Sequence, residues 1–320
     1  MSTSPATLSR DQPGEQARQP RRFWGDGRLA RHEARWGLFF ISPWIVGFLL
    51  FQLGPMLASL YFSLTEYNVL RPPEWLGLEN YRYMVTADPR FWQSLRVTFY
   101  YVVLRVPPTV VGALFCAIML NQTIKGRVIY RSLFFIPSIT PAVAAILVWT
   151  WVLDPNYGLV NYWLRAIGIE GPAWLGDPNW AVPSLVLLGI WGSIGGTSAV
   201  IFLSALQEIP VSYYEAAKVD GATWLRLQRH ITIPLLTPAI FFVLILTIIG
   251  TFQTFTAAYV GTRGGPAYAT YFFVLHLYQQ AFQNFQMGYA SALAWVLVMI
   301  LLLFTWLQMR GSERWVHYGS

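Results

Sequence analysis

The sequence predicts an all-α integral membrane protein with six transmembrane helices and a cytoplasmic helix-turn-helix between spans four and five. Of the 320 residues, 55% are hydrophobic and only 12% are charged, which is unlike the composition of an average soluble domain. A helix needs about 20 apolar residues to cross a hydrocarbon core of about 30 Å. Runs of that kind occur at residues 38–63, 97–120, 133–153, 182–206, 239–260 and 289–307.

The charges of the connections predict the orientation of these spans. Lysine and arginine gather before the first span, after the second, between the fourth and fifth, and after the sixth. The other three connections carry most of the acidic residues and several tryptophans. Basic loops stay in the cytoplasm and tryptophan favours the membrane interface, so both termini are expected inside.

Three segments follow from this pattern. Residues 1–35, rich in arginine and proline, are expected to form a disordered basic cytoplasmic tail. Residues 36–310 form the six-span domain, with a cytoplasmic loop at 207–238, and residues 311–320 form a second cytoplasmic tail. The formal net charge of +7 then reflects topology. Because no basic run is set in a soluble fold that could grip a phosphate backbone, nucleic acid is not an expected partner.

No catalytic or metal site is expected in the chain. His32, His230, His276 and His317 are scattered and lack partners at metal-ligand spacing. No GxxxxGK[ST] phosphate loop occurs, so the chain is not expected to hydrolyse ATP. No paired carboxylates or Ser/His/Asp set lies at one membrane depth, which argues against a membrane enzyme.

A polar island between the fourth and fifth spans is the most informative segment. Ser212 and Glu215 stand three residues apart and predict a capping box that starts a short helix after Pro210. Gly221 is a natural helix stop. The two alanines after Glu215 leave one helix face without bulk, so another protein can approach it closely. The island is therefore predicted to be a helix-turn-helix that docks a partner, with a solvated loop as the alternative.

The spacing of this island resembles a known family motif. Glu215-Ala216-Ala217, Gly221 and then Ile231, Ile233 and Pro234 match the EAA loop, EAA-x3-G-x9-I-x-L-P, of the membrane subunits of bacterial ATP-binding-cassette (ABC) importers. Ile233 stands where the family usually has leucine, a small change because both are apolar and similar in volume.

Two external segments narrow the resemblance to carbohydrate uptake. They are LGLENYRYMVTADPRFW at residues 76–92, and a Gly-Gly-Pro loop at 264–266 followed by MGYASA at 287–292. The chain resembles a permease of the maltose-transporter type, nearer to the first, MalF-like, of its two membrane subunits. It departs from the best-known such subunit in having six spans and no large external domain, which implies a short form of the fold.

The resemblance implies a set of partners. It implies a heterodimer with a second permease, two ATPase subunits that use ATP and Mg, and an extracytoplasmic solute-binding protein that delivers a small carbohydrate. This chain would bind no cofactor itself and would lie, surrounded by lipid, in a bacterial cytoplasmic (inner) membrane. The residues implied in ATPase docking are Glu215, Ala216, Ala217, Asp220 and Gly221.

The translocation path is expected to run past the fourth and fifth spans, which supply the solute contacts in the family. Thr247, Thr251 and Thr254 stand at i, i+4 and i+7, so they share one face of a helix. The candidate residues are Thr247, Gly250, Thr251, Gln253, Thr254, Gly195, Thr197 and Trp191. The alternative is interhelical hydrogen bonding by threonine and close packing by glycine and tryptophan.

Arg105 is a charge inside the second span, followed by Pro107 and Pro108, which are expected to bend or break the helix. Arg105 either snorkels to the outer interface, the interpretation we favour from sequence, or faces a water-filled cavity. If Arg105 faces the cavity, its positive charge adds glycerol-3-phosphate to sugars and polyols as candidate solutes. An ion-driven secondary transporter is the competing class, but the chain shows neither an intramembrane acidic relay nor two similar halves.

Overall fold

The computed structural model describes residues 28–122 and 125–316, which are mostly helical. The predicted tails lie largely outside this part at residues 1–27 and 317–320, as does His317. By its internal contacts the chain divides into two units, Met1–Leu57 and Ala58–Ser320.

In the first unit, helix α1 (Arg28–Phe48) runs into a π-helical turn, η1 (Leu49–Leu53), and then into the start of α2 (Gly54–Ser63). Residues Arg31–Ser63 are long and apolar enough to cross a membrane, and the predicted first span, 38–63, falls within them. Large apolar side chains along this unit, such as Phe40 and Phe51, are exposed. Lipid or other protein surface must cover such a helix, because exposed apolar surface of this extent is unfavourable in water.

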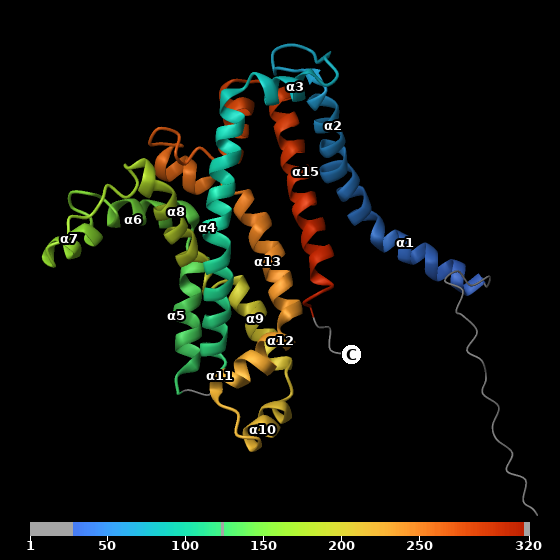
Figure 1. Ribbon diagram of the computed structural model, residues 1–320. Coiled ribbons are helices and arrows are strands. Elements are labelled where there is room, and N and C mark those ends of the chain that lie inside the picture. Colours follow the sequence, from blue (N-terminus) through green and yellow to red (C-terminus); the bar gives the residue numbers. More distant parts are fainter. Residues whose placement is uncertain (1–27, 123–124, 317–320) are drawn as a thin grey trace, which may run out of the picture. The chain divides into compact units, whose positions relative to one another are not determined.

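The second unit is built around one long helix, α4 (Pro89–Leu120). Helices α8 (Pro178–Ser193), α9 (Thr197–Glu208) and α13 (Thr237–Phe252) pack against it (Figure 1). Its 32 residues correspond to about 48 Å at the usual helical rise. Of the bend or break expected at Pro107 and Pro108, the break is wrong, since α4 continues through both prolines. Helix α4 tolerates the missing N–H groups of its two prolines because neighbouring helices pack against it and hold it in a continuous course.

Two further long helical segments match predicted spans. The fifth predicted span corresponds to α13 followed by the π-helical turn η3 (Ala257–Thr262), and the sixth to α15 (Met287–Ser312). Together with Arg31–Ser63 and α4, they make four helical segments in the described residues that could each cross a membrane unaided.

The third and fourth predicted spans are each a bent pair of helices. Helices α5 (Arg127–Ile139) and α6 (Ala142–Val152) meet at 94°, and α8 and α9 meet at 45°. Thr140 adopts an extended conformation directly before Pro141, as expected because the proline ring disfavours the helical region for the preceding residue. The predicted spans 133–153 and 182–206 therefore each cover a bent pair, and the described residues reach six spans only if each pair counts as one span.

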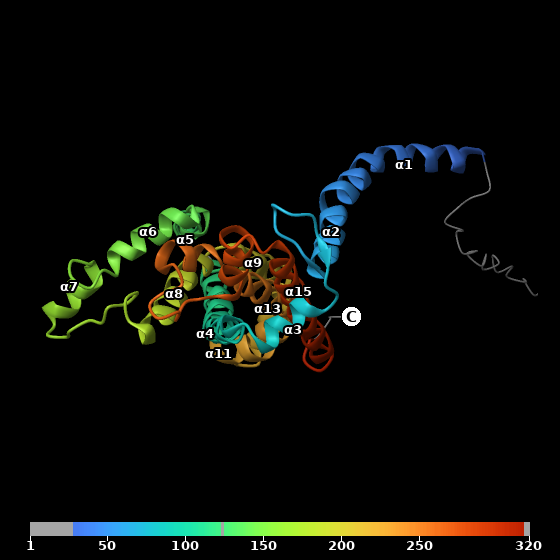
Figure 2. The same cartoon turned by 90° about the horizontal axis from the view of Figure 1, so that it is seen from above.

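The connections contain short elements. A two-stranded antiparallel hairpin, β1 (Thr65–Glu66) and β2 (Glu74–Trp75), precedes α3 (Glu79–Thr86). Helix α7 (Leu159–Ala166) lies in the connection between α6 and α8, and it extends away from α4 in both views (Figure 2). The Gly-Gly-Pro segment leads into α14 (Phe273–Tyr278) and the π-helical turn η4 (Gln279–Gln283).

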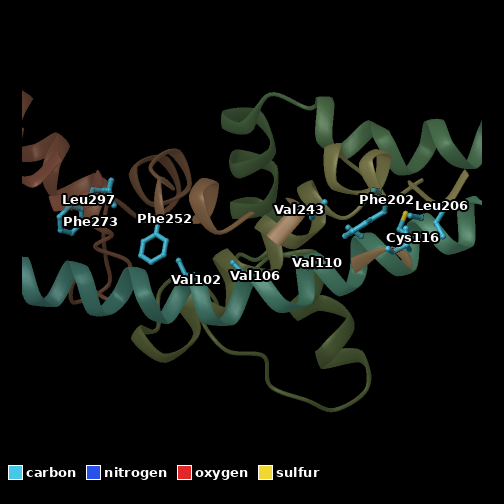
Figure 3. Close-up of a cluster of buried hydrophobic side chains, with 14 of the residues drawn as sticks. Val102, Val106, Val110, Cys116, Phe202, Leu206, Val243, Phe252, Phe273 and Leu297 are labelled. Atoms are coloured by element: carbon cyan, nitrogen blue, oxygen red, sulfur yellow. The ribbon is translucent and has the colours of Figure 1, made fainter. Parts of the chain in front are cut away.

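The apolar core follows one face of α4. Val102, Val106 and Val110 recur every four residues along it and are buried against Phe252 of α13 and Phe202 of α9 (Figure 3). Residues four apart share a face of a helix, so this stripe fixes which side of α4 the neighbouring helices cover.

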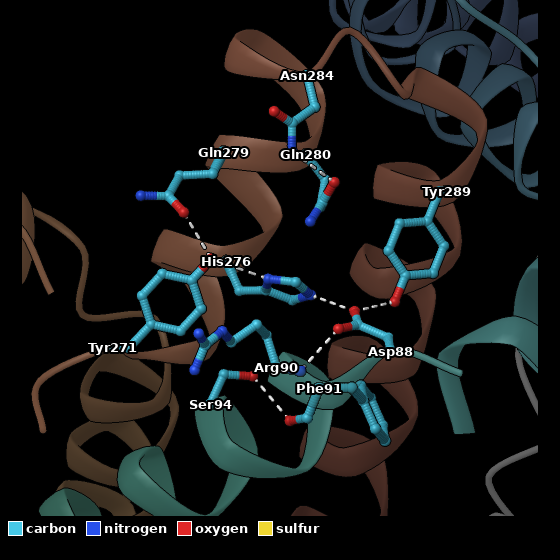
Figure 4. Close-up of polar contacts among 10 residues, drawn as sticks. All are labelled: Asp88, Arg90, Phe91, Ser94, Tyr271, His276, Gln279, Gln280, Asn284 and Tyr289. Carbon is cyan, nitrogen blue, oxygen red and sulfur yellow. Dashed lines mark hydrogen bonds and ion pairs between the residues drawn. The ribbon is translucent and has the colours of Figure 1, made fainter. Parts of the chain in front are cut away.

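Polar contacts fix the first turn of α4. Asp88, the N-cap of α4, accepts hydrogen bonds from the Arg90 amide at 2.7 Å and from the Tyr289 hydroxyl at 2.5 Å. His276 Nε2 lies 2.8 Å from the same carboxylate, and its Nδ1 lies 3.0 Å from Tyr271 Oη (Figure 4). His276 therefore has a structural role, joining α14 to the starts of α4 and α15.

Burial sets the ionisation of this cluster. It lowers the pKa of His276, although the nearby Asp88 carboxylate acts in the opposite direction. Burial alone would raise the pKa of Asp88, but the hydrogen bonds from Tyr289 and Arg90 and the neighbouring His276 bring it below its ordinary value. Burial also raises the pKa of Tyr271 to about 12. The cluster is thus built for a neutral histidine beside a carboxylate.

We predict that the purified protein loses stability as the pH falls through 6.5, the ordinary pKa of histidine. Below that pH the unfolded chain binds a proton at His276 that the folded chain resists, so acid favours unfolding. Asp88 adds a further loss below its own ordinary value of 3.8. The midpoint of thermal unfolding in detergent should fall between pH 7.5 and 5.5, and less so in His276→Gln. The exposed His230 gives a control, His230→Gln, that should follow the wild type. Parallel curves for all three proteins would contradict the prediction.

Candidate functional site

The polar island forms the predicted helix-turn-helix. Helix α10 (Val211–Val219) is followed by α11 (Trp224–Leu227), a π-helical turn η2 (Gln228–Thr232) and α12 (Ile233–Leu235). These elements lie at the opposite end of α4 from α3 (Figure 1).

The start of α10 differs from the prediction. Its N-cap is Pro210, and no side chain caps the helix, so the capping box of Ser212 and Glu215 is wrong. Pro210 already has the extended conformation of a residue that enters a helix, which places Ser212 inside the first turn rather than before it. The Glu215 side chain is exposed and forms no hydrogen bond or ion pair within residues 28–122 and 125–316.

The end of α10 is a Schellman motif. Gly221 has φ +75° and its N–H donates to the Lys218 carbonyl at 3.0 Å, while the Ala222 N–H donates to the Ala217 carbonyl at 2.9 Å. Glycine is the usual residue at this left-handed position because it has no Cβ. The predicted helix stop at Gly221 is confirmed.

One side of α10 is anchored and the other is free. Tyr214 packs against the apolar core, and its hydroxyl lies 3.1 Å from Thr232 Oγ1. Glu215, Ala216, Asp220 and Gly221 are exposed, and Ala217 is half-buried. The flanking Val211, Tyr213 and Val219 are also exposed, Val219 to 88%. The five predicted docking residues thus share a fixed, outward-facing element.

The second feature is a cavity of about 310 Å³ beside the middle of α4. This volume falls at the lower end of the range for small-molecule sites. Its walls come from α4, the α5–α6 bend, the end of α8 and the segment after α13. The lining residues are Tyr101, Arg105, Pro137, Ala142, Ala145, Ile146, Leu188, Gly189, Trp191, Gly192, Ser193, Gln253, Thr254, Phe255, Thr256 and Ala257.

Arg105 points into the bundle and lines this cavity, so the snorkelling interpretation is wrong. Its Nη1 donates to Tyr101 Oη at 2.9 Å and to Thr254 Oγ1 at 3.4 Å. Its Nη2 donates to Ser193 Oγ at 3.2 Å and to the Gly189 carbonyl at 3.4 Å. Four oxygens from three parts of the chain hold the guanidinium inside, where a snorkelling side chain would have none of them.

A missing side chain makes room for Arg105. A Cβ at Gly189 would lie 2.6 Å from Arg105 Nε and 2.8 Å from Cζ. Glycine at position 189 therefore allows α8 to approach the guanidinium, which donates to α8 at both the Gly189 carbonyl and Ser193 Oγ.

The predicted pathway residues separate into two groups. Trp191, Gln253 and Thr254 line the cavity. Thr254 does so from beyond the end of α13, which stops at Phe252, so the three threonines are not on one continuous helix. Two threonines are used by their own helix, since Thr247 and Thr251 donate to the carbonyls four residues earlier.

The remaining pathway candidates lie away from the cavity lining. Gly250 and Thr197 are exposed, and a Cβ added at Gly250 would meet nothing within 4 Å. Gly195 is buried, and a Cβ there would collide with the Phe134 carbonyl, so this glycine allows α5 to pack closely. Their place in a solute pathway stays a prediction.

Sequence reasoning missed Tyr101, Gly189 and Ser193 as cavity residues. The signal for Tyr101 and Ser193 was indirect: each is a hydroxyl in an apolar span, and each needs a partner there. Arg105 was noticed, but the sequence does not show which way its side chain points.

Comparison with known proteins identifies the family. Residues 89–314 match the family model described as "Binding-protein-dependent transport system inner membrane component". The chain belongs to this family.

Relatives of this permease cover nearly its whole length. It is 46% identical to the probable ABC transporter permease protein YesP of Bacillus subtilis, over 92% of this chain and 95% of that protein. It is 35% identical to the lactose transport system permease protein LacF of Rhizobium radiobacter, over 87% and 94%. Both identities support a multi-pass membrane subunit of an ABC transporter.

The fold also matches a solved structure. A chain of a bacterial alginate ABC transporter, crystallised with an alginate pentasaccharide-bound periplasmic protein, aligns with a TM-score of 0.80 over 92% of this permease and 100% of that chain. At 21% sequence identity, this match shows the fold alone.

We predict that Gly189→Ala displaces Arg105 and impairs transport. The added methyl group would overlap the guanidinium, which must then give up its contacts with Ser193 and Thr254. Losing charge-assisted hydrogen bonds of this kind should lower solute uptake by about tenfold, with the amount of permease in the membrane unchanged. Gly311→Ala is the control, because Gly311 lies in α15, does not line the cavity and has nothing within 4 Å of an added Cβ. Equal uptake by the two variants would contradict the prediction.

Proposed function

We propose that this permease forms half of the translocation pathway of an ATP-driven carbohydrate importer. A second permease subunit would complete the pathway as a heterodimer, two ATPase subunits would bind on the cytoplasmic side, and an extracytoplasmic solute-binding protein would deliver the solute. This chain would bind no cofactor, and ATP and Mg would be used by the ATPase.

The exposed α10 carries the proposal. A short helix that ends in a Schellman motif, is anchored through Tyr214 and exposes Glu215, Ala216 and Val219 has the features of a docking element. Small side chains permit close approach, and the adjacent apolar residues supply the area that a stable interface needs. We infer that the ATPase binds at Glu215, Ala216, Ala217, Asp220 and Gly221.

The membrane arrangement follows if each bent pair counts as one span. The described residues then contain six spans, with the α10–α12 loop and both termini on the cytoplasmic side of a bacterial inner membrane. Basic residues in this loop, among them Lys218, Arg226 and Arg229, agree with the positive-inside rule.

The cavity supports a carbohydrate as the solute. Trp191 offers an aromatic surface, while Ser193, Gln253 and Thr254 offer hydrogen-bonding groups, the combination of apolar wall and few polar groups that small-molecule sites show. The lactose permease named above supports the same class of solute. Polyols and glycerol-3-phosphate are the alternatives, because Arg105 adds a positive charge to these walls.

An ion-driven secondary transporter is the competing function. Such transporters use acidic residues within the membrane as ion or proton sites, and α4, α13 and α15 contain no aspartate or glutamate. An ATPase docked on α10 would supply the energy for transport without an acidic relay in the membrane.

We predict that Gly221→Ala and Glu215→Ala uncouple uptake from ATP hydrolysis. Alanine at φ +75° costs about 1–2 kcal/mol, which reshapes the end of α10, whereas Glu215→Ala removes an exposed carboxylate without disturbing the fold. Both variants should reach the membrane and show at least about a fivefold loss of binding-protein-stimulated ATPase activity and uptake.

Gly168→Ala is the matched control for this experiment. Gly168 has φ +79° and ends α7 with the same pair of backbone hydrogen bonds, from Gly168 to Arg165 and from Ile169 to Leu164. It therefore carries the same backbone strain away from the docking surface and should transport normally. Normal ATP-dependent uptake by both docking variants would refute the role assigned to α10.

A direct test of the energy source uses proteoliposomes that contain the complete importer. Uptake should require ATP on the cytoplasmic side and should persist when ionophores collapse the proton and sodium gradients. Uptake that stops with the gradient at constant ATP would instead indicate a secondary transporter.

A further inference from the structure

Arg105 places an uncompensated positive charge in the cavity wall. Within residues 28–122 and 125–316, no carboxylate lies within 4.0 Å of its guanidinium. None of the cavity-lining residues is acidic. The charge lies in the bundle interior, where the four hydrogen bonds of the guanidinium hold it.

The present partners orient the guanidinium without neutralising it. All four acceptors are uncharged oxygens, and two of the contacts are as long as 3.4 Å. Arg105 Nε is buried and has no hydrogen-bond partner in the part of the chain that the structure describes. A buried charge is costly unless an opposite charge accompanies it, and arginine is well shaped to bind carboxylate or phosphate oxygens.

We infer that the cavity takes an anionic carbohydrate, with Arg105 as the counter-ion of its carboxylate or phosphate group. This inference rests on the proposed importer function and narrows its solute. Trp191 faces the sugar ring, and Ser193, Gln253 and Thr254 serve its hydroxyl groups. The solute therefore supplies the negatively charged group that the described cavity lacks.

A second source of negative charge is an acidic residue of the partner permease. In that case Arg105 would hold the two permeases together and would not distinguish acidic from neutral solutes. The test must therefore compare solutes that differ only in charge.

The experiment uses the complete importer with its binding protein in proteoliposomes. The probes are matched pairs of acidic and neutral solutes: digalacturonate with galactobiose, dimannuronate with mannobiose, and glycerol-3-phosphate with glycerol. The first two pairs report on a carboxylate and the third on a phosphate. The variants are Arg105→Gln, which removes the charge, and Arg105→Lys, which keeps it. Arg96→Gln is the control, because Arg96 lies on the same helix, is exposed and does not line the cavity.

We expect the wild type to import at least one acidic probe in clear preference to its neutral partner. Arg105→Gln should lower that uptake by about tenfold or more, Arg105→Lys by less, and Arg96→Gln not at all. Import of neutral probes only, or of none of the probes, would overturn the inference. Equal losses for the acidic and neutral members of a pair in Arg105→Gln would assign the arginine to the subunit interface and would overturn it as well.

Binding-protein-stimulated ATP hydrolysis separates this inference from the proposed function. If the wild-type assembly hydrolyses ATP in response to its binding protein, the importer function stands whatever the probes show. If it does not, the proposed function fails first. The amount of ATPase that co-purifies with Arg105→Gln shows whether that variant still assembles. If Arg105→Gln fails to assemble, Arg105→Lys, which keeps the charge, still compares acidic with neutral solutes.

Discussion

The structure depends on one constraint: polar groups inside an apolar helical bundle must find their partners within it. Helix α4 meets this constraint at two levels. At its first turn Asp88 accepts a hydrogen bond from Tyr289 of α15 and pairs with His276 of α14. In its middle Arg105 draws α8 and the segment after α13 to the same point. Because these partners come from distant parts of the sequence, they fix the rotation of α4 about its axis, and the valine stripe then faces the core.

The apolar runs predicted much of the fold, because span length depends on local composition. The second, fifth and sixth predicted spans match α4, α13 with η3, and α15 closely. The bends were not predicted, although Pro141 and Gly195–Gly196 were visible, since a hydropathy run does not show whether a proline or glycine kinks a helix or merely lies in it. Pro107 and Pro108 illustrate the opposite error, because packing keeps α4 continuous there.

The candidate site was harder to predict than the fold. Gly221 was predictable because its requirement is local: a helix must end, and glycine accepts the left-handed conformation. The direction of Arg105 depends on Gly189, which lies 84 residues further along the chain, and on Thr254. The role of the threonine stripe stays a prediction for a related reason. A helix can satisfy a threonine hydroxyl with its own carbonyl four residues earlier, as at Thr247 and Thr251, so spacing alone does not identify a solute-facing group.

The two sites are joined by a short stretch of chain, and this connection gives the proposed mechanism a physical route. Ser193, which holds Arg105, is the last residue of α8. After the 45° bend, α9 continues for 12 residues, about 18 Å, and passes through Ile209 and Pro210 into α10. A displacement of α10 by a docked ATPase would therefore act through one rigid helix on the bend next to Ser193. Because the contact of Arg105 with the Gly189 carbonyl is long at 3.4 Å, a small rotation at this bend would be enough to break it and to move the guanidinium that binds the anion. Rigid-body motion about a packed interface is an established form of conformational switching. In this permease the glycine-rich bend would be its hinge.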